Sequence, residues 1–123
     1  MENPWDNPYD YAQLMCEREL LIVLVDEQQF SFDRLSNHPK LKIYPEEVIL
    51  AASRNLNRKG LVDFHESVHD QVFDIRYFDK VTIEGLSLYT RIKAADKWAK
   101  HVKDCEQIGI HPENAIMQPY REV

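Results

Sequence analysis

Two histidines near the middle of the chain, His65 and His69, have the chemistry to bind a metal ion together with the nearby carboxylates of Glu66 and Asp70. The surrounding residues alternate between apolar and polar types, which predicts a β-hairpin within residues 61–81. In a hairpin, a four-residue spacing does not bring two side chains together as it does on a helix. The sequence also offers no fixed third ligand. We therefore expect a solvated polar loop here and no metal site.

The residues that carry covalent catalysis give little support for an enzyme. Cys16 and Cys105 stand 89 positions apart, each in an apolar helical pattern, so we expect inert, buried or half-buried thiols. The chain has no glycine-rich phosphate loop, no serine-centred elbow and no His-Glu-x-x-His helix. We expect neither catalysis nor a cofactor.

The composition predicts one globular domain. The chain has 123 residues, of which 44% are hydrophobic, and this is enough to bury a core. The longest apolar run, residues 20–25, is too short to cross a bilayer, and the acidic N-terminus does not resemble a secretory signal. We therefore expect a cytoplasmic protein with reduced cysteines.

Charge is distributed unevenly, although the whole chain has a net charge of −6. Residues 1–36 hold eight acids and two bases, whereas residues 37–60 hold five bases and two acids, a net charge of +3. Residues 61–83 return to −3, and residues 84–123 balance six bases against six acids. Because an acidic protein repels polyanions overall, only the segment 37–60 has the charge to attract them.

Helical patterns fill most of the first half of the chain. After an irregular arm at 1–9, a central helix is predicted at about 10–28 with Asp10 as its N-cap, and a short helix at 32–37. A third helix is predicted at 45–59. Its buried stripe is Val48, Ala52 and Leu56, with Ile49 widening it, and its end is marked by Gly60.

The second half of the chain is predicted to form the hairpin, with strands at 61–65 and 71–81, and then one long helix. We expect this last helix to begin within two or three residues of Thr82 and to run for about 20 residues. Its main apolar stripe is Leu88, Ile92, Ala95, Ala99 and Val102. Residues 105–123 are assigned to a C-terminal tail, of which the stretch 110–123, with two prolines, is expected to be irregular.

This order of elements resembles a winged helix-turn-helix domain over residues 10–104. The resemblance depends on the helix-to-hairpin junction LNRKGLV at 56–62, on the hairpin, and on a Thr-x-x-Gly-like element at Thr82, Glu84 and Gly85. The stretch from 81 to 98 is also similar to small phage and prophage winged-helix proteins of unknown function. The fold class implied is α+β, mostly α, with a β-hairpin wing and a long C-terminal helix. The connector SNHPKLKIY at 36–44 is longer than the usual turn between the second and third helices.

The resemblance implies that the third helix enters the major groove of double-stranded DNA. An outward face would place Arg54 and Asn57 against base edges. The full set of expected DNA-contacting residues is Lys40, Lys42, Ser53, Arg54, Asn57, Arg58 and Lys59. The implied function is that of a sequence-specific transcriptional regulator of phage or prokaryotic type. The alternative for these side chains is that Arg58 and Lys59 only complement the helix C-terminus and that Arg54 is simply solvated.

The hairpin favours a second hypothesis. Asp63, Glu66 and Asp70 make its tip acidic, which does not suit a phosphate backbone. A non-enzymatic protein-interaction module on the same fold, for example a phage inhibitor of a host protein, would use such a surface instead.

The last helix carries a second apolar stripe beside its main one, formed by Ala94, Trp98, His101 and Cys105. Extra apolar surface of this kind predicts a homodimer interface. The alternative is that Trp98 packs inside the chain against Trp5 or Tyr9 of the N-terminal arm.

Overall fold

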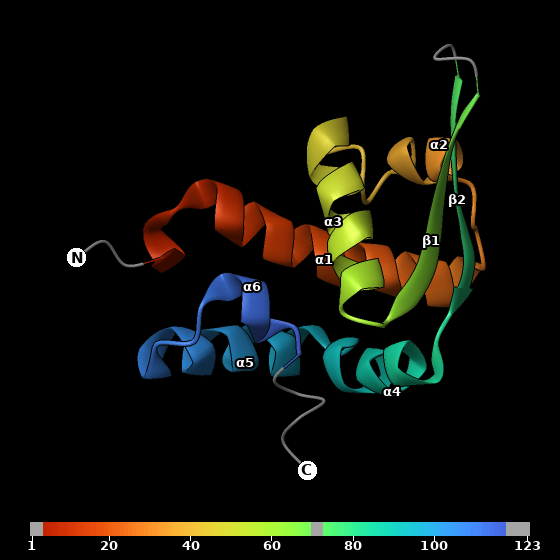
Figure 1. The fold of residues 1–123 in the computed structure, drawn as a ribbon. Helices are drawn as coiled ribbons and strands as arrows, with labels where there is room; N and C mark the ends of the chain where they lie inside the picture. Colours follow the sequence, from red (N-terminus) through yellow and green to blue (C-terminus); the bar gives the residue numbers. More distant parts are fainter. Residues whose placement is uncertain (1–3, 70–72, 118–123) are drawn as a thin grey trace.

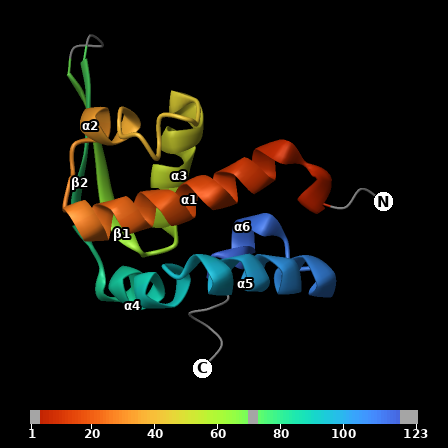
Figure 2. The same cartoon turned by 180° about the vertical axis from the view of Figure 1, so that it is seen from behind.

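Helix α1, Pro8–Glu27, lies at the centre of the computed structural model, with other elements on both sides of it (Figures 1 and 2). The structure describes residues 4–69 and 73–117. The predicted N-cap, Asp10, is wrong, because Asn7 takes this place and its side chain accepts a 2.9 Å hydrogen bond from the backbone N–H of Tyr9. Pro8 suits the first helical position, where no N–H is needed. Buried residues surround the helix, as expected for a central one: Leu14, Cys16, Leu20, Leu21, Ile22, Val23 and Leu24.

Helices α2, Phe32–Ser36, and α3, Glu46–Arg58, lie with the hairpin on one side of α1 (Figure 1). The predicted apolar stripes are confirmed: α2 buries Phe32 and Leu35, and α3 buries Val48, Ile49, Ala52 and Leu56. The chain leaves α3 through Gly60, whose φ of +77° is in the left-handed region that favours glycine.

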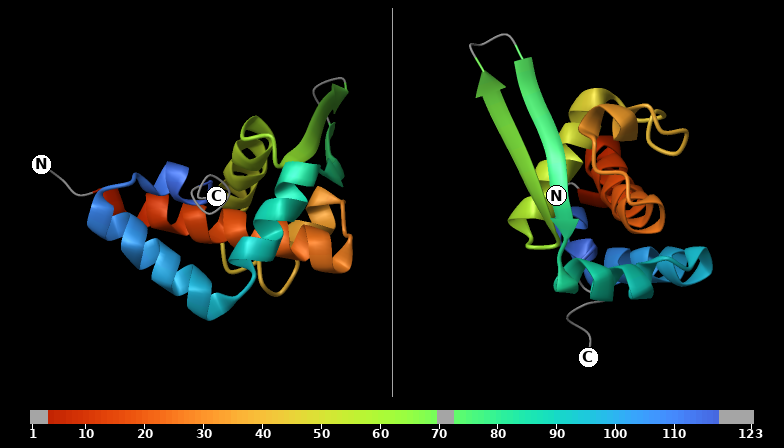
Figure 3. Two further views of the ribbon diagram at one scale, coloured as in Figure 1. Left: turned by 90° about the horizontal axis from the view of Figure 1, so that it is seen from below. Right: turned by 90° about the vertical axis from the view of Figure 1, so that its right-hand side faces the viewer.

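The hairpin consists of antiparallel strands β1, Val62–His69, and β2, Phe73–Val81, so β1 extends beyond its predicted end. The register shifts between Asp63 and Phe64, and the buried rings of Phe64 and Phe78 meet with centroids 4.7 Å apart. The segment before α2 also pairs with β2, because the N–H of Phe78 donates to the carbonyl of Phe30 at 2.9 Å. This pairing fixes the hairpin beside the helices (Figure 3).

The predicted single C-terminal helix is wrong, because the chain forms α4, Ile83–Ile92, and α5, Ala95–Ile108. Both lie on the opposite side of α1 from α3 (Figure 2). The buried side chain of Arg18 on α1 explains the break. Its Nε donates to the carbonyl of Ile92 at 2.9 Å and its Nη2 to that of Lys93 at 3.1 Å. Arginine thus binds backbone carbonyls at the end of α4, as a C-terminal cap does.

The break changes which residues of the last segment are buried. Leu88, Ile92 and Val102 of the predicted main stripe are buried, but Ala95 and Ala99 are exposed. Helix α5 instead buries Trp98, Val102 and Cys105.

The two terminal segments of the described chain contact each other. Trp5, in the short helix η1, Pro4–Asp6, is buried, and its indole N–H donates to the carbonyl of Ile110 at 2.7 Å. The expectation of an irregular stretch at 110–123 is wrong for part of its described residues, because α6, Pro112–Ala115, lies within it. Ala115 and Ile116 belong to the hydrophobic core.

The junction between the hairpin and α4 is tightly built around Thr82. Its hydroxyl donates to the carbonyl of Gly60 at 2.7 Å and accepts from the N–H of Gly85 at 3.0 Å, which confirms that the helix begins beside Thr82. At Gly85 a Cβ atom would lie 2.1 Å from the carbonyl oxygen of Leu61. The glycine therefore lets α4 approach the start of the hairpin. None of the helices within the described residues is long and apolar enough to cross a membrane.

Candidate nucleic-acid interface

The outer face of α3 carries three of the polar side chains that the sequence singles out. Arg54, Asn57 and Arg58 are exposed, on the side of the helix away from the buried stripe. Lys40 and Lys42 are also exposed, on the turns that connect α2 to α3. The buried side chain of Leu41 and the hydrogen bond from the N–H of Lys42 to the carbonyl of His38, at 2.8 Å, hold this connector in place.

Ser53 does not belong to this face, and its prediction as a DNA contact is wrong. It is fully buried, and its hydroxyl donates to the carbonyl of Ile49 at 2.8 Å. A serine can enter an apolar interior in a helix because the carbonyl one turn earlier satisfies its hydroxyl. The buried face of α3 is therefore wider than the apolar residues indicate.

Lys59, predicted as a phosphate contact, is engaged inside the chain. Its Nζ lies 2.7 Å from Oε1 of Glu17 on α1, and the two side chains are only 12% and 1% exposed. Burial raises the pKa of Glu17, and the positive charge of Lys59 acts against that rise. Lys59 thus compensates a buried carboxylate and joins the end of α3 to the central helix.

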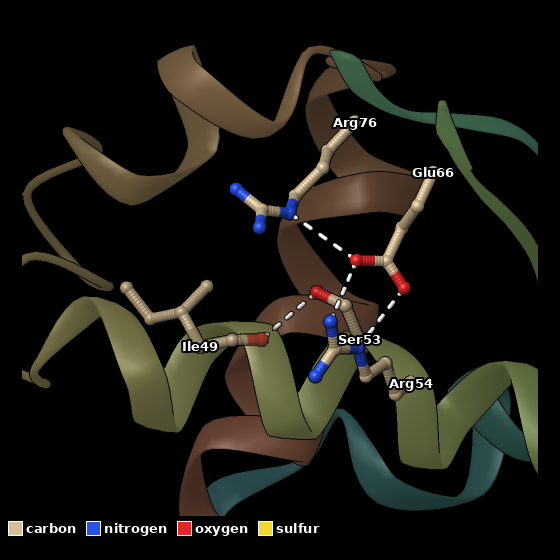
Figure 4. A network of polar contacts seen from close by, with 5 residues as sticks. All are labelled: Ile49, Ser53, Arg54, Glu66 and Arg76. Carbon is tan, nitrogen blue, oxygen red and sulfur yellow. Dashed lines mark hydrogen bonds and ion pairs between the residues drawn. The ribbon is translucent and has the colours of Figure 1, made fainter. Parts of the chain in front are cut away.

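Arg54 lies in a network with two residues of the hairpin, Glu66 on β1 and Arg76 on β2 (Figure 4). The guanidinium of Arg54 donates to both oxygens of Glu66, from Nε at 2.9 Å and from Nη2 at 2.8 Å. Nε of Arg76 donates to Oε1 of the same carboxylate at 3.3 Å. Hydrogen bonding from Arg54 lowers the pKa of Glu66, so the carboxylate stays ionised.

The remaining two residues of the face make polar contacts of their own. Oδ1 of Asn57 accepts a 3.0 Å hydrogen bond from the N–H of Phe64, and Nη2 of Arg58 donates to Oδ1 of Asn55 at 2.6 Å. Both side chains remain exposed. These hydrogen bonds hold the two side chains in place on the outer face of α3.

Arg76 is a member of this surface that the sequence reasoning did not include. It is directly opposite Glu66 in the hairpin register, and its guanidinium lies 5.7 Å from the centre of the Phe32 ring. The signal available in the sequence was the alternation of β2, which puts Arg76 and the buried Phe78 on one face. Arg76 therefore stands on the face of β2 that turns toward the helices.

The proposed histidine cluster falls partly outside the described structure. The side chain of His69 and all of Asp70 lie outside the described residues, whereas His65 stacks on Tyr77 with ring centroids 5.2 Å apart. Within the described residues, no three His, Cys, Asp or Glu side chains are placed to hold a metal ion.

Both cysteines are buried. Cys16 lies in the core, and burial raises its pKa to about 12, which keeps the thiol protonated. Cys105 lies 3.4 Å from Nε2 of His101, and the same ring nitrogen is 2.8 Å from the carbonyl oxygen of Ala115.

The second stripe of the last helix is used inside the chain. Trp98 and Cys105 are buried, Nε2 of His101 lies 2.8 Å from the carbonyl oxygen of Ala115 at the end of α6, and Ala94 is half-buried at the break between α4 and α5. The prediction that this stripe is an exposed interface is wrong for Trp98 and Cys105. Trp98 packs inside the chain, but the partners that the structure shows for its ring are Arg18 and His101, in place of the predicted Trp5 or Tyr9.

Comparisons of the chain with protein-family models, with curated proteins and with solved structures found no match. The geometry of the surface on α3 and the hairpin therefore carries the functional argument.

Proposed function

We propose that this chain is a winged helix-turn-helix protein that binds double-stranded DNA, with α3 in the major groove and the hairpin as its wing. The proposal includes the role of a sequence-specific transcriptional regulator of phage or prokaryotic type. The observation that carries it is the exposed face of α3, where Arg54, Asn57 and Arg58 lie beside the hairpin. Arginine and asparagine are the side chains best suited to guanine and adenine edges in that groove.

The position of the hairpin supports the winged-helix part of the proposal. The pairing of Phe78 with Phe30 joins β2 to the segment before α2, and the Arg54–Glu66 contact joins β1 to α3. These two contacts fix the orientation of the hairpin relative to α3. A wing needs a fixed orientation if it is to contact DNA together with the recognition helix.

The surface supports DNA binding with five of the seven residues expected from the sequence, together with Arg76. Lys40 and Lys42 would bind phosphates, since lysine acts there as a mobile positive charge. Asn57 would read a base edge, and Arg54 and Arg58 would contact the backbone, Arg54 beside the hairpin and Arg58 at the end of α3. Ser53 and Lys59 have no part in this proposal because both are engaged inside the chain.

A salt titration with random and mixed-sequence duplexes tests this function. We expect binding at about 50 mM salt that weakens steeply as salt increases. Asn57→Ala should cost about 1–3 kcal/mol of binding free energy and relax the preference at one base pair. Lys97→Ala is the matched control, because Lys97 is exposed on α5, across α1 from α3. Absence of duplex binding by the wild-type protein at about 50 mM salt would contradict the proposal.

A second candidate is a protein-interaction module, and exposed apolar side chains on the hairpin favour it. Ile75 and Tyr77 on β2 are 50% and 44% exposed, on one face of the hairpin, opposite Ser67 and His65 in the register. Apolar side chains exposed together on one face are typical of a protein-binding surface. Two results together would favour the protein-interaction module. The wild-type protein would not bind duplex DNA, and Tyr77→Ser would abolish its binding to a protein partner.

A further inference from the structure

We propose that Arg54 and Arg76 form a phosphate-binding site, and that the carboxylate of Glu66 occupies this site in the absence of DNA. The inference deepens the proposed function and rests on it for the identity of the phosphate, which we assign to the backbone of the bound duplex. In this inference the carboxylate of Glu66 competes with a DNA phosphate for the two guanidinium groups.

The first argument is the geometry of the three side chains (Figure 4). Two guanidinium groups, one from α3 and one from β2, converge on one anion. Arg54 binds both of its oxygens, at 2.9 and 2.8 Å, and Arg76 binds one of them at 3.3 Å. A bidentate guanidinium is the arrangement with which proteins bind carboxylates and phosphates alike.

The second argument is the chemical similarity of the two anions. A phosphodiester carries one negative charge over two unesterified oxygens, as a carboxylate does. A backbone phosphate can therefore accept the same pair of hydrogen bonds from Arg54 without any change in the helix that carries it.

The third argument is that an incoming anion can reach the site. The side chains of Arg54, Glu66 and Arg76 are 55%, 31% and 23% exposed. Solvent therefore reaches the ion pairs, and a phosphate that offers Arg54 the same two hydrogen bonds can exchange with the carboxylate of Glu66. Arg76 is held over the ring of Phe32 and would stay in place while Glu66 turns away.

The surroundings also set the direction of approach. A hollow of about 430 Å³ beside Arg76 is lined by Pro45, Glu46, Glu47 and Leu50. Its two carboxylates would repel a phosphate. The phosphate should therefore arrive from the side of Arg54, which is the side that the exposed face of α3 presents to DNA.

The test compares Glu66→Gln with Asp63→Asn. Both changes remove one negative charge from β1, but Asp63 lies three positions before Glu66 and its carboxylate is 3.8 Å from Nζ of Lys80. We expect Glu66→Gln to tighten duplex binding by roughly threefold to tenfold and to steepen the salt dependence by about one phosphate contact, whereas Asp63→Asn should change affinity less than about twofold. Equal effects of the two variants would overturn the inference, because they would reflect net charge alone.

A second measurement needs no DNA. Inorganic phosphate is titrated into the full chain while the Nε–H signals of Arg54 and Arg76 are followed by nuclear magnetic resonance. We expect both signals to shift together and saturate at lower phosphate in Glu66→Gln than in the wild type or in Asp63→Asn. Unchanged signals in Glu66→Gln would overturn the site. Saturation in that variant without duplex binding by any form would uphold the anion site and reject the DNA-binding function.

Discussion

The guanidinium carbon of Arg18 lies 5.5 Å from the centre of the Trp98 ring, so one side chain of α1 covers the largest buried residue of α5. The same guanidinium binds the carbonyls of Ile92 and Lys93. Arg18 therefore ends α4 and positions α5 at once.

Replacing Trp98 by alanine should destabilise the fold without changing its oligomeric state. Trp98 is 4% exposed, and truncation of such a side chain costs about 3–5 kcal/mol of unfolding free energy. Chemical denaturation measures the loss, and light scattering of the native fraction measures the mass. A folded variant that differs from the wild type only in dissociating a dimer would contradict this location for Trp98.

Gly85→Ala should reverse the usual preference of helices for alanine. Alanine in a helix is normally better than glycine by about 0.5–1 kcal/mol. At this position the new Cβ would lie 2.1 Å from the carbonyl oxygen of Leu61, a backbone atom that cannot move aside alone. We expect a loss of about 3 kcal/mol, in the range of overpacked sites. Glu84→Ala, one residue earlier on the exposed side of α4, is the control and should stay within about 0.5 kcal/mol.

Lys59→Met should reduce stability more than it reduces any affinity for DNA. It leaves the carboxylate of Glu17 buried without its positive partner, for which about 3 kcal/mol is expected. Adding Glu17→Leu should recover most of that loss, since the uncompensated charge is then gone. Thermal unfolding of the single and the double variant measures both effects. An unchanged unfolding temperature in Lys59→Met would contradict the role of Lys59 as the partner of Glu17.

Lys42→Ala provides the opposite case. The side chain is exposed on the connector, so the unfolding free energy should change by less than about 0.5 kcal/mol. If the connector contacts a phosphate, the variant should bind all duplexes more weakly and lower the slope of the salt dependence by about one. An unchanged slope would remove the connector from the DNA-binding surface.

Helix α3 and the start of α4 were predictable because local sequence patterns determine them. The spacing of Val48, Ala52 and Leu56 indicated the buried side of α3, and the change of pattern at Thr82 indicated the start of α4. Both signals lie within a few residues of the structure they predict. Helix α3 and the hairpin could therefore be placed on the chain before their packing was known.

The errors share a different cause, which is a partner far away in the sequence. The break after α4 depends on Arg18, 74 positions before Ile92, and the burial of Lys59 depends on Glu17, 42 positions earlier. Glu66 appeared as one acid among several on the hairpin, because its contact with Arg54 requires the packing of β1 against α3. Ser53 differs, since its partner is local, but a polar residue on an apolar stripe gives no sign of which way it points.

The bond between Trp5 and Ile110 has a consequence for how the protein is made. A chain is synthesised from its N-terminal side, so α1 emerges before the elements that cover it, with apolar residues around it that have nothing yet to contact. Its last partners, Ala115 and Ile116, are translated about 100 residues later. The nascent chain would therefore remain a substrate for chaperones until residue 116 has left the ribosome, and ribosomes stalled before residue 110 should hold it in a protease-sensitive state.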